Sequence, residues 1–150
     1  MTLYFEDLAV GDEWTNGTYE VTDREIITFA EQYDPQWFHT DPERAAEESI
    51  YGGLIAAGFH TAAISTRLLV DSVLTEMATM GAKGIDELRW HEPVRPGDRL
   101  STRAEVLKRT VETDRRGLID LFVETETADG TVVFSMIALV MVGRRRVDDD

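Results

Sequence analysis

The sequence predicts an α+β fold in which an antiparallel sheet wraps around a long central helix. A run of small and apolar residues follows Tyr51-Gly52-Gly53 with helical spacing, and it stays apolar over most of its circumference until about Val70. Four segments rich in Val, Thr, Ile, Leu and Phe come after it, separated by turn signals. A helix that is apolar on nearly all sides must be covered, and long strands provide the cover.

Short helices are predicted before this central helix. Segment 22–25, Thr-Asp-Arg-Glu, has the form of a capping box, in which the hydroxyl and the carboxylate both bond the first free amides of a helix. Pro35 disfavours helical geometry at Asp34, so this helix should end there. Asp41-Pro42 predicts an N-cap with proline in the first turn of a second helix that runs through Glu48.

The C-terminal half predicts strands over 85–91, 99–110, 117–127 and 131–142. The turns at 114–117 and 129–130 indicate hairpins and therefore antiparallel pairing. Residues 6–19 could supply one or two more strands. A long buried helix followed by long antiparallel strands is the arrangement known as the hotdog fold.

Composition excludes several classes of function. The 150 residues fit one domain over 1–150, with a charged, solvated tail from about 144 to 150. The chain has 15 Lys and Arg against 29 Asp and Glu, a formal charge of −14. Such a chain repels nucleic acid and anionic membrane surfaces, so neither is an expected partner.

Cysteine is absent, which excludes disulfides, Cys-ligated zinc and thiol nucleophiles. No histidine pair has metal-ligand spacing, so no metal site is expected. The N-terminus lacks the pattern of a signal peptide, and the most apolar stretch, 54–70, is too short and too polar to cross a bilayer. We therefore expect a soluble, cytoplasmic protein.

The densest set of reactive side chains lies in segment 33–41. Asp34 and His39 are five residues apart, an offset of about 140° on a continuous helix, so they would not face each other there. Because Pro35 ends the helix, a turn could bring both side chains to one point, where a carboxylate and an imidazole can share a water molecule. The alternative is that Asp34 caps a helix and His39 is a structural histidine.

Segment 51–60 is glycine-rich at the start of the central helix. Free amides and the helix dipole there stabilise negative charge on an oxygen, although Gly58 could equally serve close packing. Ser65 and Thr66 lie one or two turns further on and could bond a carboxylate or the helix backbone. Pro93 should end a strand and segment 96–98, Pro-Gly-Asp, should make a turn.

Together these segments resemble the MaoC-like dehydratase family, which includes the (R)-specific enoyl-CoA hydratases. The matching elements are YFEDLAVGD at 4–12, DPQWFHTD at 34–41, GLIAAG at 53–58 and PVRPGD at 93–98. The resemblance implies a hotdog fold, a homodimer or dimer-based oligomer, and a CoA-linked or acyl-carrier-protein-linked thioester as substrate. It implies no metal or redox cofactor.

The resemblance also implies roles for individual residues. Asp34 and His39 fall on the family's catalytic pair, and Gly58 on the glycine whose amide bonds the thioester carbonyl. Thr66 lies where a hydroxyl supports the catalytic aspartate, with Ser65 as a less exact match.

Two positions depart from the family pattern. Gln36 replaces an asparagine in a motif whose proline has moved forward, and Ala57 stands where many members have His or Gln before the glycine. By that position the resemblance also makes Ala57 a candidate substrate-binding residue. Both departures leave the pair of Asp34 and His39 intact.

The predicted activity is the reversible hydration of trans-2-enoyl thioesters to 3-hydroxyacyl thioesters. Two alternatives remain at this stage. One is an acyl-CoA thioesterase on the same fold, in which water attacks the thioester carbonyl. The other is a non-catalytic subunit that binds acyl thioesters.

Overall fold

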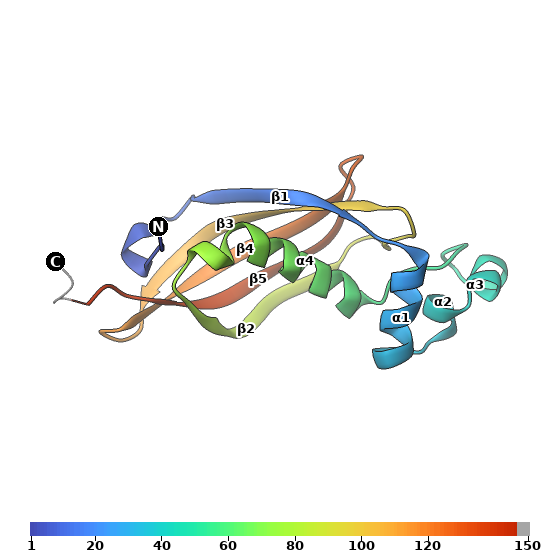
Figure 1. Ribbon diagram of the computed structural model, residues 1–150, viewed down its shortest axis with the longest axis horizontal. Helices are drawn as coiled ribbons and strands as arrows, with labels where there is room; N and C mark the ends of the chain where they lie inside the picture. Colours follow the sequence, from blue (N-terminus) through green and yellow to red (C-terminus); the bar gives the residue numbers. More distant parts are fainter. Residues whose placement is uncertain (147–150) are drawn as a thin grey trace.

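A computed structural model describes residues 1–146 of the chain (Figure 1). Five strands and four α-helices form its main elements, together with two short 3-10 helices. In chain order they are η1 (Phe5–Asp7), β1 (Glu13–Glu20), α1 (Asp23–Tyr33), α2 (Trp37–Thr40), α3 (Pro42–Glu48), α4 (Gly58–Ser72), η2 (Leu74–Glu76), β2 (Thr79–Trp90), β3 (Arg99–Val111), β4 (Arg116–Thr127) and β5 (Val132–Gly143).

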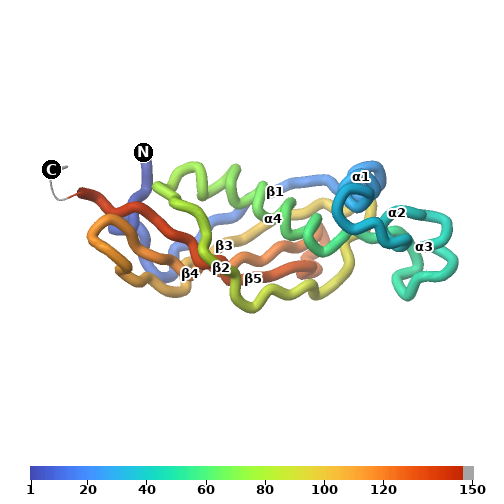
Figure 2. The backbone as a smooth tube through the Cα atoms, turned by 90° about the horizontal axis from the view of Figure 1, so that it is seen from below, coloured from blue at the N-terminus to red at the C-terminus, as the bar shows by residue number. Residues whose placement is uncertain are grey.

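The five strands form one sheet in the order β1-β3-β4-β5-β2, and every neighbouring pair is antiparallel. Helix α4 lies along one face of this sheet (Figures 1 and 2). Helices α1 to α3 sit at one end of the molecule, opposite the N-terminus and the end of β5. The predicted α+β hotdog fold is confirmed.

The alternation of apolar side chains along β4 explains how the sheet holds its helix. Ile119, Leu121 and Val123 are fully buried and belong to the same core as Ile64 and Leu68 of α4. Successive strand residues point to opposite faces, so every second residue of β4 faces this core. The predicted hairpins at both ends of β4 are also confirmed by its pairing with β3 and β5.

Helix α4 differs from its prediction in two ways. It begins at Gly58 rather than near Leu54, and residues 54–57 are not helical. The amides of Ile55 and Ala56 are drawn to carbonyls outside the helix, those of Phe38 and Val94. The buried residues of α4 also recur every three to four positions, so within the described chain only one face of this helix is buried.

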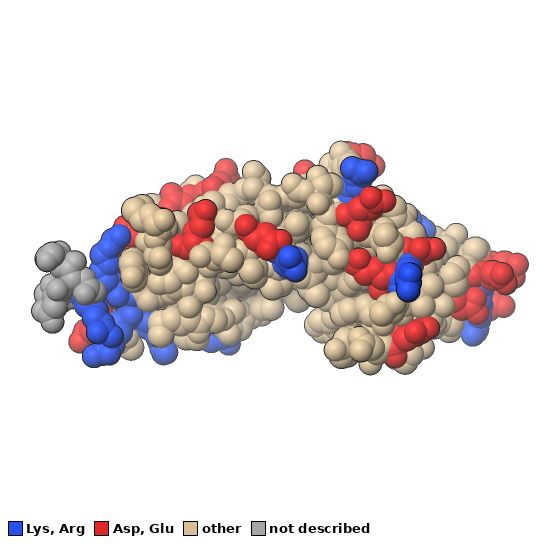
Figure 3. All heavy atoms as spheres, in the orientation of Figure 1, with Lys and Arg blue, Asp and Glu red and all other residues tan. Residues whose placement is uncertain are grey.

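One strand boundary needs correction, because β2 begins at Thr79, earlier than expected. Residues 6–19 contribute one strand, which agrees with the expected one or two, and residues 5–7 form a 3-10 helix. In the charged tail Arg144 lies near Glu6 and Arg145 pairs with Asp7, while Arg145 and Arg146 are exposed. Basic side chains gather at this end of the molecule in Figure 3. Residues 147–150 of the tail lie outside the described residues.

None of the helices over residues 1–146 combines the length and the apolar character needed to cross a membrane.

Candidate active site

The turn between α1 and α2 brings Asp34 and His39 together. Helix α1 ends at Tyr33, and Asp34 is its C-cap with non-helical backbone angles, φ −154° and ψ 69°. The next helix, α2, carries His39 in its third position. His39 Nε2 lies 3.4 Å from Asp34 Oδ2, and Gln36 Nε2 donates to Asp34 Oδ1 at 2.7 Å. The chain therefore makes the turn that Pro35 predicted.

A backbone carbonyl sets the protonation of His39. Its Nδ1 lies 2.7 Å from the carbonyl oxygen of Ile55, which only accepts hydrogen bonds, so we assign the proton to Nδ1. In this tautomer the lone pair of Nε2 points toward Asp34. The His39 side chain is 5% exposed and that of Asp34 is 32% exposed. A water molecule beside this pair would meet two acceptors, one of them the carboxylate.

Gly58 opens α4 with its amide free of any intrahelical partner, as in the first turn of every α-helix. The buried Ala57 is its N-cap. Trp90 Nε1 donates to the Gly58 carbonyl oxygen at 2.8 Å, and a Cβ on Gly58 would lie 2.5 Å from the indole. Only glycine fits here without moving the tryptophan, so the packing role and the free amide coexist at one residue.

A cavity of about 420 Å³ contains these groups. That volume lies within the range of small-molecule sites, roughly 300–1,000 Å³. Asp34, His39 and Gly58 all line it, and its walls are mainly apolar and aromatic. The remaining lining residues are Phe38, Tyr51, Ile55, Ala56, Phe59, Thr61, Trp90, His91, Glu92, Pro93 and Val94.

Sequence reasoning missed part of this lining. The sequence predicts only a strand end at Pro93, yet segment 90–94 forms one wall of the cavity. His91 Nε2 of this wall lies 2.7 Å from Ser135 Oγ. The same segment also positions the site, because the Val94 carbonyl accepts from the Ala56 amide at 2.9 Å. The motif around Pro93 was the available signal, since it follows a strand and precedes a turn.

Three of the predicted substrate-binding residues, Ala57, Ser65 and Thr66, do not line this cavity in the described chain. Thr66 is exposed and its hydroxyl donates to the Ala62 carbonyl at 2.9 Å. Ser65 is fully buried, donates to the Thr61 carbonyl at 2.9 Å and lies 2.6 Å from Thr125 Oγ1. Both hydroxyls therefore follow the local alternative, a bond back to their own helix.

Residues 1–146 hold no group of three or more His, Asp or Glu side chains placed to bind a metal ion. The cavity is lined by the Asp34 carboxylate, the His39 imidazole and Gly58. The two side chains can exchange protons, and the Gly58 amide can donate a hydrogen bond to an oxygen atom.

Comparison with known proteins gives a consistent family. The solved structure of a MaoC-like dehydratase from Rhodospirillum rubrum is 42% identical with a TM-score of 0.88, covering 97% of this chain and 99% of that one. The uncharacterized protein YdeM of Bacillus subtilis is 26% identical over 142 residues, covering 95% of this chain and all of that protein. The 3-hydroxyacyl-thioester dehydratase Z of Mycobacterium tuberculosis is 33% identical over 89 residues, which are 58% of each chain.

The family model described as MaoC like domain matches residues 9–128, a region that includes Asp34, His39 and Gly58. With this match over most of its length, the chain belongs to the MaoC-like domain family.

Proposed function

We propose that this protein is an enoyl-CoA hydratase that adds water reversibly to trans-2-enoyl thioesters. One observation carries the proposal: Asp34, His39 and the free amide of Gly58 line the same cavity. The names of two relatives, a MaoC-like dehydratase and a 3-hydroxyacyl-thioester dehydratase, support the same reaction class.

In the proposed reaction a water molecule sits beside the pair, within hydrogen-bond reach of both Asp34 Oδ2 and His39 Nε2, which are 3.4 Å apart. The imidazole lone pair takes one proton as the water oxygen bonds to the β-carbon, while the other hydrogen stays on that oxygen and donates a hydrogen bond to Asp34, which holds the water in place. The double-bond electrons move toward the thioester, whose oxygen becomes negative. The imidazolium then returns its proton to the α-carbon, which completes the addition of water.

Gly58 supplies the acceptor for the developing charge. A thioester oxygen bonded to its amide gains stabilisation as the enolate forms, because the positive end of the α4 dipole points the same way. Removing a single donor of this kind costs roughly 10²–10³ in turnover in other acyl-transfer enzymes. The apolar walls would hold the acyl chain and limit access of bulk water.

Crotonyl-CoA is a suitable probe because it tests the alternatives together. Loss of enone absorbance without release of free thiol is the expected result and means hydration. Release of free thiol would instead identify a thioesterase. Absence of both changes, with binding retained, would identify a binding subunit and contradict the proposal.

We also propose that the working form is a homodimer. Strand β2 lies at an edge of the sheet and exposes Met80 and Ile85, about half of each residue being accessible. Exposed edges of this kind pair readily with a second chain. Sedimentation at micromolar concentration should give twice the chain mass, and a monomer would contradict this proposal.

A further inference from the structure

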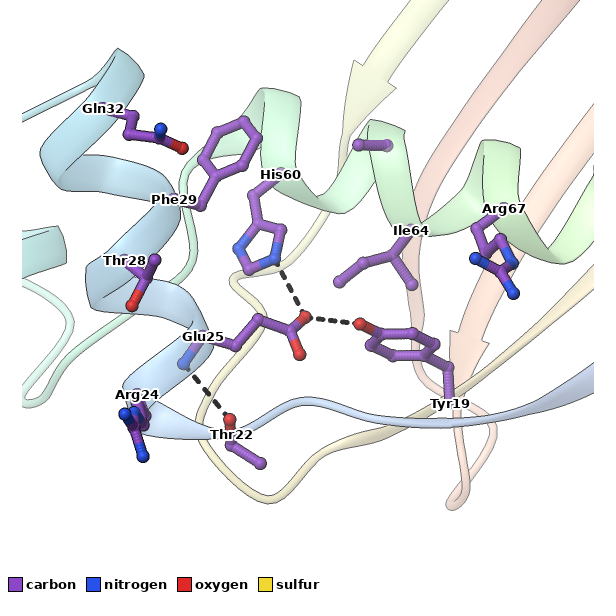
Figure 4. A pocket seen from close by; sticks show the side chains of 11 residues that line it. Tyr19, Thr22, Arg24, Glu25, Thr28, Phe29, Gln32, His60, Ile64 and Arg67 are labelled. Carbon is purple, nitrogen blue, oxygen red and sulfur yellow. Dashed lines mark hydrogen bonds and ion pairs between the residues drawn. The ribbon is translucent and has the colours of Figure 1, made fainter.

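A second histidine–carboxylate pair, His60 and Glu25, joins α4 to α1. His60 of α4 is buried, and its Nε2 lies 3.0 Å from Glu25 Oε1 on α1. The Phe29 ring, one turn further along α1, stacks on the imidazole at 4.6 Å with an interplanar angle of 8°. Figure 4 shows His60 between these two side chains. A single residue of α4 thus contacts α1 at two successive turns.

Glu25 also ties this contact to the sheet. The Tyr19 hydroxyl, from β1, donates at 2.8 Å to the same oxygen that faces His60 (Figure 4). Burial, followed by the hydrogen bond to Glu25, raises the pKa of Tyr19 to about 12, so the phenol remains a donor. Three elements, β1, α1 and α4, therefore meet at one carboxylate.

The use of Glu25 departs from the capping box expected from the sequence. Thr22 does cap α1, since its hydroxyl accepts from the Glu25 amide at 3.2 Å. In a full capping box the glutamate would reach back to the Thr22 amide. Here the carboxylate reaches Tyr19 and His60 instead, so the side chain serves tertiary contacts in place of local ones.

These contacts lie close to both halves of the candidate active site. His60 follows Gly58 by two residues in the first turns of α4, and Asp34 caps the other end of α1. A helix moves as a rigid unit over the roughly 16 Å of its 11 residues. A shift of α1 at Glu25 and Phe29 would therefore displace Asp34 relative to the Gly58 amide.

We propose that His60 is a positioning residue, which holds α1 on α4 through Glu25 and Phe29 and so sets the distance from Asp34 to the Gly58 amide. The inference rests on the proposed hydratase function. A misplacement of about 1 Å can cost 10²-fold in rate, so a contact outside the cavity can control turnover.

The test compares His60→Leu with His60→Gln. Leucine fills similar space without a donor, whereas glutamine offers an amide N–H near the position of Nε2. We expect His60→Leu to lower kcat for crotonyl-CoA at least tenfold with KM changed less than threefold. His60→Gln should recover kcat to within about threefold of the wild type. The shape of the pH–rate profile should be unchanged in both variants, because His60 exchanges no proton with substrate.

Further measurements keep the proposal falsifiable. Tyr19→Phe removes one partner of Glu25 with little change of volume and should lower kcat two- to fivefold, whereas Tyr4→Phe, at the far end of the molecule, should leave it unchanged. Amide hydrogen exchange over residues 30–39 should be faster in His60→Leu and restored in His60→Gln, whether or not the protein turns over crotonyl-CoA.

The outcomes separate the two proposals. No turnover by the wild type, with the expected exchange pattern, would contradict the hydratase function and leave α1 positioning by His60 supported. Normal kcat in folded His60→Leu would overturn the positioning role alone. Unchanged exchange over 30–39, or a pH–rate profile that loses one limb in His60→Leu, would overturn it too.

Discussion

Two histidine–carboxylate pairs use opposite ends of α1, Asp34 at its C-cap and Glu25 in its first turn, and they are nearly matched in their surroundings. In each, Nε2 of a buried histidine faces a carboxylate whose side chain is about one third exposed, at 3.4 Å for His39 and Asp34 and at 3.0 Å for His60 and Glu25. The difference is on the other ring nitrogen. Nδ1 of His39 bonds the Ile55 carbonyl, whereas Nδ1 of His60 is buried without a partner among the described residues.

Because of that difference we assign the ring proton to Nδ1 in His39 and to Nε2 in His60. The Ile55 carbonyl places the hydrogen of His39 on Nδ1 and leaves a lone pair toward Asp34, so the pair has room for a water proton. His60 has no such acceptor behind it and donates its hydrogen from Nε2 to Glu25. Two pairs that are alike in residue type and burial thus differ in the group behind the ring, and this difference favours His39 as the proposed acceptor of a water proton.

The largest effect on turnover should come from changes to Asp34 and His39. Asp34→Asn and His39→Ala should each lower kcat for crotonyl-CoA by at least about 10²-fold, because the water loses its orienting carboxylate or its proton acceptor. Asp41→Asn is the matched control: it makes the same change at the N-cap of α3, where asparagine caps as well as aspartate. Near-normal turnover in both cavity variants would remove the pair from the mechanism.

The next effect should come from Gly58→Ala. The new Cβ would meet the Trp90 indole at 2.5 Å, so the indole or the start of α4 must move, and the amide moves with it. We expect kcat/KM to fall about tenfold or more, in line with the loss of an oxyanion donor. Gly53→Ala is the control, because its Cβ would meet only Arg95 Nη1 at an ordinary 3.5 Å. Equal rates for the two variants would contradict the role of the Gly58 amide.

A pH experiment would test the pair of His60 and Glu25 through its effect on stability. Burial lowers the pKa of His60 from its usual 6.5, against the opposing effect of Glu25. Below pH 6.5 the unfolded chain then binds a proton that the folded chain refuses, so stability falls as the pH falls toward the folded pKa. We expect Tm to drop less between pH 7 and pH 5 in His60→Gln than in the wild type. An identical drop would show that burial and Glu25 cancel at His60, and a smaller drop in the wild type would show that Glu25 outweighs burial.

The smallest effect is expected at Thr66. Its hydroxyl is exposed and bonded to its own helix, so Thr66→Ala should keep kcat within about twofold of the wild type. A tenfold loss would mean that this hydroxyl supports an aspartate of a second copy, and that the site is completed across two chains. The activity assay on the purified variant decides between these outcomes.

Local signals in the sequence were enough to predict the four C-terminal strands, the end of α1 and a turn at Pro35 that could bring Asp34 to His39. Each depends on neighbouring residues, such as Pro35, whose geometric effect is local. The family resemblance also pointed to Gly58, which does line the cavity. These predictions needed no knowledge of which distant segments meet.

The features that could not be predicted all depend on distant contacts. The start of α4 at Gly58 follows from hydrogen bonds of residues 55 and 56 to carbonyls far along the chain. The proton position on His39 depends on the Ile55 carbonyl, and the turning of Glu25 away from its capping box depends on Tyr19 and His60. Helical spacing also overstated how much of α4 is buried, because it describes composition and not what packs on each face.

The two hydrogen bonds that flank the start of α4 have a consequence for how the protein folds. The bond from Ile55 to Phe38 closes a short loop, whereas the bond from Ala56 to Val94 closes a longer one that contains α4 and β2. Closure of the longer loop costs more chain entropy. We therefore expect the wall at 90–94 to join the cavity later in folding than the local turn that pairs Asp34 with His39.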